Sequence, residues 1–127
     1  MERRCQVLYV DDHDDSALMF RTLLGYSNHD VVTAGTAEKA LELAREREFD
    51  LYVVDKRLPD GSGLELCKRL NESTPGIPVI LYSGEAYEVV RQKALDAGAR
   101  AYVTKPDIEQ LVETIQRLLS EKKSAAA

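Results

Sequence analysis

The stretch LYVVDKRLPDGSG, from Leu51 to Gly63, combines a short apolar run, one carboxylate and a turn-rich segment. Its first four residues are β-formers without a charge among them, which is typical of a strand buried on both faces. Asp55 follows at the carboxyl end of this strand. Pro59, Gly61 and Gly63 are expected to forbid both helix and strand, so a loop is predicted after Asp55. A carboxylate in this position suits chemistry, although Asp also serves simply as a turn residue.

Apolar strands alternate with amphipathic helices on both sides of this stretch. Strict alternation, with right-handed crossovers, implies a parallel sheet with helices on both faces. The sequence therefore predicts an α/β fold, a doubly wound five-stranded parallel sheet with five helices. The strands are predicted at 7–10, 30–34, 51–54, 79–82 and 101–103, and the helices around 15–24, 37–46, 66–70, 87–97 and 108–119.

The apolar spacing also predicts which helical side chains face the sheet. Gly98 is expected to end the fourth helix. The inward-facing residues are predicted to be Ala17, Phe20, Leu23 and Leu24 in the first helix, and Tyr87, Val90, Ala94 and Ala97 in the fourth.

Length and composition indicate a single domain. The 127 residues, 44% of them hydrophobic, suffice for one domain with its own core. We expect the domain to cover residues 1–122, with a disordered tail over residues 123–127. The apolar run that ends at Asp11 is too short for a signal peptide or a membrane span, so no contact with a membrane is expected.

Charge and cysteine content exclude further classes. A net charge of −5, without a cluster of Lys and Arg, argues against direct binding of nucleic acid. Cys5 and Cys67 lack a metal-ligand spacing and lie in apolar contexts, which favours two free, buried thiols. Free thiols are typical of a reducing compartment, so we expect a cytoplasmic location.

Polar residues stand at the carboxyl ends of four predicted strands. In a doubly wound sheet these ends meet at one edge, and ligands bind there, where the winding reverses. If each of these residues only capped a turn, they would not be expected to converge at one edge of the sheet. The residues are Asp11 and Asp12 after the first strand, Asp55 after the third, Ser83 after the fourth and Lys105 after the last.

These residue types indicate a cation and an anion in one pocket. Three crowded carboxylates repel one another unless a hard divalent cation such as Mg²⁺ lies between them. Lys105 and Ser83 offer a positive charge and a hydroxyl to anionic oxygens near Asp55. With no histidine or cysteine base expected at the strand ends, the only evident nucleophile is a carboxylate, which can accept a phosphoryl group.

Four ordered motifs run along the chain. They are VDD at Val10 to Asp12, D-x-x-L-P-x-x-x-G from Asp55 to Gly63, YSGEA at Tyr82 to Ala86, and DAGARAYVTKP from Asp96 to Pro106. Each motif is weak alone, but together, at these spacings, they are very specific and cover nearly the whole chain. With them the chain resembles the receiver domain of two-component response regulators. The resemblance implies a flavodoxin-like fold with strand order 2-1-3-4-5.

The resemblance implies a chemistry for the pocket. Asp55 would accept a phosphoryl group from a sensor histidine kinase or a phosphotransfer protein, with help from Lys105. Mg²⁺, or Mn²⁺, would be bound by Asp11, Asp12, Asp55 and the main-chain carbonyl of Arg57. The chain would not be an enzyme beyond slow self-phosphorylation from small donors and autodephosphorylation.

The resemblance also implies a switch. The Ser83 hydroxyl would move to the phosphoryl group, and Tyr102 would swing inward behind it. The face formed by the fourth helix, the last strand and the last helix would then change its partners, which would be a downstream protein or an output domain absent from this sequence. The bond between Lys105 and Pro106 is typically cis in this family.

Three alternatives stay open at this stage. The first is a receiver-like interaction scaffold that is never phosphorylated. The second is a flavodoxin-like flavin carrier, although the acidic residues in 11–15 would repel its phosphate. The third is a phosphatase with an aspartyl nucleophile, which would carry a second Asp two residues after Asp55, where this chain has Arg57.

Two charged residues flank the predicted mouth of the pocket. Arg57 lies two residues beyond Asp55, and Glu85 lies two residues beyond Ser83. They are either two solvated loop charges or a pair that closes over the pocket and excludes water. A closed pair predicts a longer-lived phosphoryl group.

Overall fold

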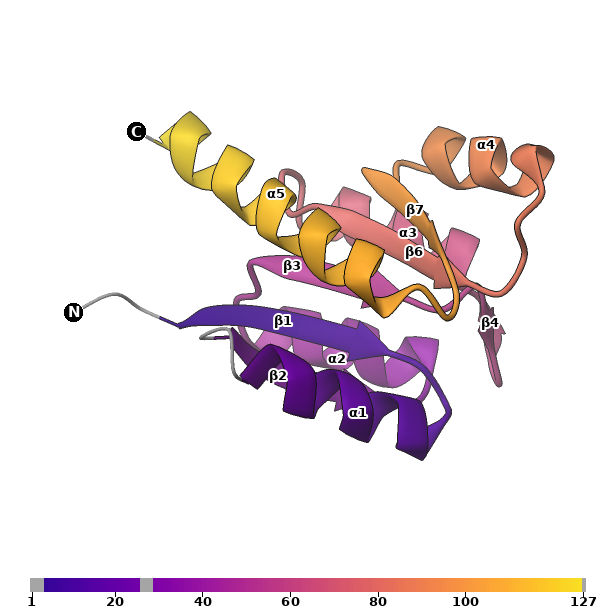
Figure 1. The fold of residues 1–127 in the computed structure, drawn as a ribbon, viewed down its shortest axis with the longest axis horizontal. Helices are drawn as coiled ribbons and strands as arrows, with labels where there is room; N and C mark the ends of the chain where they lie inside the picture. The colour runs from indigo at the N-terminus through magenta and orange to yellow at the C-terminus, as the bar shows by residue number, and fades with distance from the viewer. Residues whose placement is uncertain (1–3, 26–28, 127) are drawn as a thin grey trace.

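The computed structural model describes residues 4–25 and 29–126 of the 127-residue chain. The strands are β1 (Cys5–Val10), β2 (His29–Ala34), β3 (Leu51–Val54), β4 (Arg57–Leu58), β5 (Gly61–Ser62), β6 (Val79–Ser83) and β7 (Ala101–Thr104). The helices are α1 (Asp14–Gly25), α2 (Ala37–Glu46), α3 (Gly63–Ser73), α4 (Glu88–Asp96) and α5 (Ile108–Ala126). A sheet lies between two helical layers, with α1 and α5 on one face and α2, α3 and α4 on the other (Figure 1).

The main sheet is parallel throughout, with strand order β2-β1-β3-β6-β7. Because β4 and β5 pair only with each other, this order is the predicted 2-1-3-4-5. The predicted doubly wound α/β fold with five helices is therefore confirmed. The winding reverses between β1 and β3, so a crevice is expected beyond the carboxyl ends of these two strands.

The burial of β3 on both faces explains why its sequence shows no alternation of apolar and polar residues. Tyr52 and Val54 pack into the core under α2, α3 and α4, whereas Leu51 and Val53 pack into the core under α1 and α5. All four residues are at most 1% exposed. A strand buried on both faces has no position for a solvated side chain, as the apolar run predicted.

The segment after Asp55 is more regular than the predicted loop. Residues 57–58 and 61–62 form a short antiparallel pair, β4 and β5. Pro59 and Asp60 lie between the two strands, so the proline does not have to supply a ladder N–H. The prediction of a loop was wrong here because the turn allows the flanking residues to pair. Gly63, which was expected to prevent a helix, is the first residue of α3, where a glycine is tolerated.

The β4–β5 hairpin is tied to the start of α2. The carboxylate of Asp60 accepts the main-chain N–H groups of Ala37 and Glu38 at 2.8 and 3.0 Å. The hydroxyl of Thr36 accepts the N–H of Lys39 at 3.1 Å, so Thr36 is the N-cap of α2. The first N–H groups of α2 are therefore satisfied partly by its own cap and partly by the hairpin.

Two side chains that were predicted to face inward are exposed. Tyr87 is 71% exposed because α4 begins only at Glu88, which leaves Tyr87 in extended backbone at the N-cap. Leu23 is 40% exposed at the edge of the apolar stripe of α1, whereas Phe20 and Leu24 are buried.

The last helix extends further than expected. α5 continues to Ala126, through most of the residues 123–127 that were predicted to be a disordered tail, and Ala127 lies outside the described residues. Residues 120–126 contain neither Pro nor Gly, so nothing in their sequence stops a helix. None of the helices in the described parts of the chain is long and apolar enough to cross a membrane.

Both cysteines are free thiols, as predicted, but only one is fully buried. Cys67 is buried in α3, and Cys5 is half-buried in β1. Burial raises the pKa of the Cys67 thiol to about 11. Cys67 is therefore protonated at neutral pH and serves as a small apolar core residue.

Gly63 allows the first turn of α3 to lie against the backbone that carries Asp55. A Cβ atom at this position would lie 2.1 Å from the main-chain oxygen of Asp55. The N–H of Gly63 also donates to the main-chain oxygen of Lys56 at 2.7 Å. A side chain at residue 63 would push this backbone away.

We expect Gly63→Ala to lower the free energy of unfolding by about 1–3 kcal/mol, because the added methyl group overlaps backbone atoms. Urea unfolding followed by circular dichroism measures this loss. Gly35→Ala is the matched control, since a Cβ there would meet no atom within 4 Å. Equal effects of the two substitutions would contradict the close approach at Gly63.

Candidate functional site

The predicted strand-end residues meet at the carboxyl edge of the sheet. Asp11 and Asp12 follow β1, Asp55 follows β3, Ser83 ends β6 and Lys105 follows β7. The side chain of Asp11 is fully buried at the base of the site. Above it lies a cavity of about 550 Å³ lined by Asp12, His13, Asp55, Arg57, Leu58, Pro59, Ser83, Gly84, Glu85 and Lys105.

The buried carboxylate of Asp11 has four hydrogen-bond donors around it. Its Oδ2 accepts the Tyr9 hydroxyl and the Lys105 ammonium, both at 2.9 Å. Its Oδ1 accepts the main-chain N–H of His13 at 2.9 Å, and the ring Nδ1 of His13 lies 2.8 Å away. Burial alone would raise the pKa of Asp11, but these hydrogen bonds outweigh it and the pKa is lowered. Asp11 is therefore an anion at neutral pH.

Lys105 joins two carboxylates across the sheet edge. Its ammonium lies 2.9 Å from Asp11 Oδ2 and 3.3 Å from Asp55 Oδ2. Burial would lower the pKa of Lys105, but the hydrogen bonds and charges of the two carboxylates raise it. Lys105 is thus a fixed positive charge beside Asp55. The cis peptide bond that was predicted between Lys105 and Pro106 is present.

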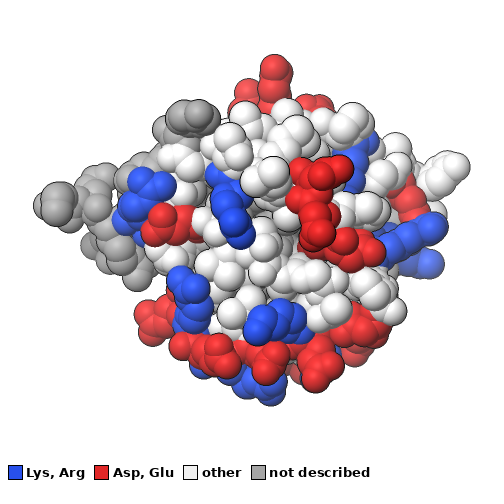
Figure 2. Space-filling model, turned by 90° about the horizontal axis from the view of Figure 1, so that it is seen from below, with Lys and Arg blue, Asp and Glu red and all other residues white. Residues whose placement is uncertain are grey.

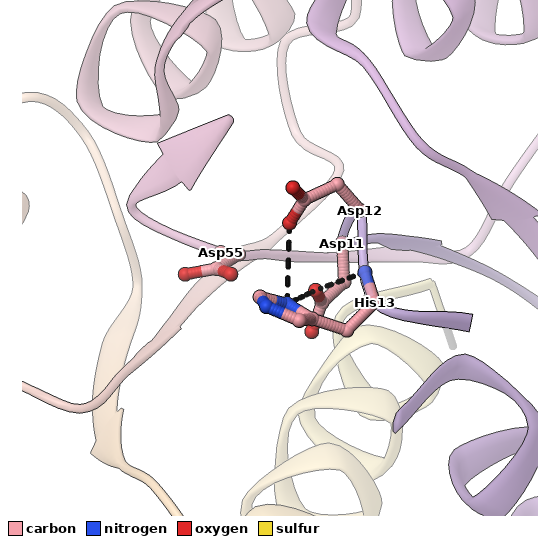
Figure 3. A group of neighbouring side chains, drawn as sticks. All are labelled: Asp11, Asp12, His13 and Asp55. Atoms are coloured by element: carbon pink, nitrogen blue, oxygen red, sulfur yellow. Dashed lines mark hydrogen bonds and ion pairs between the residues drawn. The ribbon is translucent and has the colours of Figure 1, made fainter. Parts of the chain in front are cut away.

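Asp12 and His13 line the cavity next to Asp11 (Figure 3). The ring Nδ1 of His13 lies 3.2 Å from Asp12 Oδ1, in addition to its contact with Asp11. The pKa of His13 is raised, first by the hydrogen bond with Asp11 and then by the charges of both acids. The expectation that no histidine lies at the strand ends was therefore wrong, although the position of His13 directly after the acidic pair was an available signal.

The donor set of the cavity fits a hard divalent cation. Each of Asp11, Asp12 and Asp55 offers a carboxylate oxygen and His13 offers a ring nitrogen, and these four atoms lie within 4.8 Å of one another. Carboxylate oxygens are the protein ligands that Mg²⁺ takes. The main-chain N–H of Arg57 lies 3.4 Å from Asp55 Oδ1, so its backbone also borders the acidic group.

The loop after Ser83 is fixed by hydrogen bonds to two buried residues. The main-chain N–H of Glu85 donates to Ser83 Oγ at 3.3 Å. The hydroxyl of Tyr102, on β7, donates to the main-chain oxygen of Glu85. Ser83 is 4% exposed and Tyr102 is 6% exposed. Tyr102 is thus turned inward, toward the loop that borders the cavity.

The side chain of Glu85 forms two ion pairs at the mouth of the cavity. Its Oε1 lies 2.9 Å from Arg57 Nη2, and its Oε2 lies 2.9 Å from Lys56 Nζ. The hydrogen bonds from Lys56 and then from Arg57 lower the pKa of Glu85. The predicted pairing of Arg57 with Glu85 is therefore present, whereas the part played by Lys56 was missed.

Charges of both signs share the face seen in Figure 2. Lys and Arg side chains are interspersed with Asp and Glu there, and no broad basic area covers this face. The expectation that the chain does not bind nucleic acid directly stays a prediction.

The fold and the strand-end site define a small α/β domain with an acidic pocket and a fixed lysine. The sequence matches the response regulator receiver domain over residues 7–116. The chain therefore belongs to the response regulator receiver domain family, as its motifs indicated. Receiver domains are the phosphoacceptor domains of two-component systems, and they interact with histidine kinases or phosphotransfer proteins and with output domains.

Relatives with assigned names support this placement. The probable transcriptional regulatory protein TcrX of Mycobacterium tuberculosis is 39% identical over 89% of this chain and 49% of its own length. The polar-differentiation response regulator DivK of Brucella ovis is 33% identical over 91% of this chain and 96% of its own length. The chain thus spans about half of TcrX but nearly all of DivK.

Solved structures of receiver domains have the same fold. A CheY-like receiver domain protein from Methanospirillum hungatei has a TM-score of 0.87 and 32% identity, over 95% of this chain and 98% of its own. The beryllofluoride-activated receiver domain of DrrB has a TM-score of 0.83 and 32% identity, over 91% of this chain and 97% of its own.

The hydrogen bond of Tyr102 gives a stability prediction. Tyr102→Phe should lower the free energy of unfolding by about 1 kcal/mol, because the partly buried main-chain oxygen of Glu85 loses the Tyr102 hydroxyl as its hydrogen-bond donor. Tyr87→Phe is the control, since Tyr87 is 71% exposed, and it should change stability by less than about 0.5 kcal/mol. Urea denaturation of the two variants makes the comparison. A Tyr102→Phe protein as stable as the Tyr87→Phe protein would show that the hydrogen bond is not formed in solution.

Proposed function

We propose that Asp55 is the residue of this receiver that accepts the phosphoryl group. The observation that carries the proposal is the place of its carboxylate, which lies in the cavity at the end of β3 and 3.3 Å from the Lys105 ammonium. An Asp55 oxygen would form a bond to phosphorus while the N–P bond of a phosphohistidine donor breaks. The electron pair of that bond returns to the donor imidazole.

Two side chains stabilise the transferred group in this proposal. Lys105 keeps its contact with Asp11 and turns its remaining N–H donors to the phosphoryl oxygens. The hydroxyl of Ser83 already accepts the N–H of Glu85, so its own hydrogen is available to donate to a phosphoryl oxygen. Both groups are placed before the reaction, which reduces the cost of orienting them.

The residues that would hold Mg²⁺ or Mn²⁺ are Asp11, Asp12, Asp55 and the main-chain carbonyl of Arg57. When bound, the cation would neutralise negative charge that builds up on the phosphoryl oxygens. Asp11 is oriented for this role because its donors already fix its carboxylate. The proposal is supported by the carboxylate oxygens of Asp11, Asp12 and Asp55, which lie within 4.8 Å of one another.

The output of this site would pass through Ser83 and Tyr102. A phosphoryl group on Asp55 would draw the Ser83 hydroxyl toward it and shift the loop that contains Glu85. Tyr102 donates a hydrogen bond to that loop, so the equilibrium between its side-chain positions would then shift. The face formed by α4, β7 and α5 is where we expect a partner to sense this change.

The proposed phosphoryl donor is a sensor histidine kinase or a phosphotransfer protein. The proposed target of the signal is a downstream protein or an output domain. We place this exchange in the cytoplasm. The domain itself would act as a signalling acceptor with at most slow self-phosphorylation and autodephosphorylation. Arg57 supports slow hydrolysis, since it stands where an aspartyl phosphatase would carry a second acid.

The first prediction from this proposal concerns covalent labelling. Incubation with acetyl phosphate and Mg²⁺ should add one phosphoryl group, and intact-mass spectrometry should detect it. Asp55→Asn protein, or wild-type protein with EDTA, should gain none, because the nucleophile or the cation is missing. Asp30→Asn is the control, since its carboxylate pairs with Arg4 at the opposite end of the sheet. Equal labelling of the Asp55→Asn protein would rule out Asp55, and no labelling of any protein would favour the unphosphorylated scaffold.

The second prediction concerns the lifetime of the phosphoryl group. If the Arg57–Glu85 pair closes the cavity mouth, replacing either residue with Ala should shorten the half-life of phospho-Asp55, by roughly twofold or more. The double variant should be faster than either single variant, but by less than the product of their effects, because both remove the same pair. Strictly multiplicative effects in a double-mutant cycle, or a longer half-life in the double variant, would mean that the pair is no gate.

A further inference from the structure

His13 places a ring nitrogen beside the three carboxylates of the acidic cavity. Its ring Nδ1 lies 2.8 Å from Asp11 Oδ1 and 3.2 Å from Asp12 Oδ1. Figure 3 shows the ring among the carboxylates of Asp11, Asp12 and Asp55. The ring nitrogen belongs to the same set of four atoms within 4.8 Å of one another. A cation held by the three carboxylates would therefore be within reach of an imidazole.

The placement of His13 comes from its backbone and not from hydrophobic packing. Its main-chain N–H donates to Asp11 Oδ1 at 2.9 Å, which anchors the residue beside the acidic pair at the turn before α1. Its side chain is 68% exposed. The ring is thus free of the core and can exchange its contacts with the acids for a metal ion.

Ligand chemistry determines what an added imidazole does. An all-oxygen site suits Mg²⁺, which dehydrates reluctantly and keeps several waters. An imidazole nitrogen suits Co²⁺, Ni²⁺ and Zn²⁺, for which nitrogen ligands add much more affinity. A mixed site would gain affinity for the second group of ions while its affinity for Mg²⁺ changes little.

We propose that His13 is a metal ligand that sets the ion selectivity of this receiver, giving its acidic pocket a marked preference for divalent transition-metal ions. This inference rests on the proposed function, in which Asp11, Asp12 and Asp55 hold the cation. The alternative is that His13 only donates a hydrogen bond to the acids. In that case its removal would not separate one metal from another.

Calorimetric titration of the tag-free chain with NiCl₂ and with MgCl₂ tests the inference. His13→Phe removes the ring nitrogens, and His13→Asn removes them but keeps a hydrogen-bond donor near Asp11. In both variants Ni²⁺ should bind at least about tenfold more weakly than in the wild type, whereas the dissociation constant for Mg²⁺ should change by less than about threefold. Asp12→Asn should weaken binding of both metals, which places Ni²⁺ in the same pocket.

Nitrogen NMR of the histidine rings provides a direct readout. The chain has two histidines, and the other, His29, pairs with Cys5 at the opposite end of β1. Adding ZnCl₂ should shift the ring nitrogen signals of His13 and leave those of His29 in place. The His29 signals thus serve as an internal control for ions bound elsewhere.

Failure of the inference and failure of the proposed function give different results. If the wild type binds no Mg²⁺, the proposed cation site is wrong and the inference falls with it. If Mg²⁺ binds but the ratio of Ni²⁺ to Mg²⁺ affinity is the same in wild type and His13→Phe, only the selectivity role of His13 is overturned. Unshifted His13 ring signals with Zn²⁺ bound, or Ni²⁺ binding that survives Asp12→Asn, would overturn it too.

Discussion

The arrangement of the site depends on the buried carboxylate of Asp11. An anion without exposed surface is stable only when donors surround it, and here they come from both ends of the sequence. Lys105 is 94 residues away in the chain, yet its ammonium lies 2.9 Å from Asp11. This contact holds the end of β7 over the end of β1 and leaves Lys105 between two acids. The position of the fixed cation beside Asp55 is thus partly a consequence of satisfying Asp11.

The parallel sheet makes this arrangement possible. Because all five strands run in one direction, each contributes its terminal residue to the same edge, and the helices fill the two faces. Gly63 permits α3 to start immediately against the backbone of Asp55, and Asp60 fastens the hairpin between them to α2. The Asp55 carboxylate is therefore carried by a segment that is fixed at several points, which suits the reaction proposed for it, since that reaction depends on positioning.

Much of this could be predicted from the sequence, because apolar runs that end in polar residues report strand direction as well as burial. The same reasoning missed Lys56 and His13, although His13 directly follows the acidic pair. Their roles depend on where loops bring their side chains, which periodicity does not encode. It also placed Tyr87 inward, since it counted helical spacing through a residue that lies just before α4 and is 71% exposed. Spacing within an element is informative, whereas its first residue is set by local backbone geometry.

Glu85 contacts different partners through its side chain and its backbone. The carboxylate holds Arg57 and Lys56 at the cavity mouth, and the main-chain oxygen accepts the hydroxyl of Tyr102. Under the proposed function, a displacement of this one residue would alter access of water and the anchoring of the tyrosine at the same time. Signal duration and signal strength would then not be independent traits. Natural selection for a briefer response in this protein would also alter how strongly the response is read.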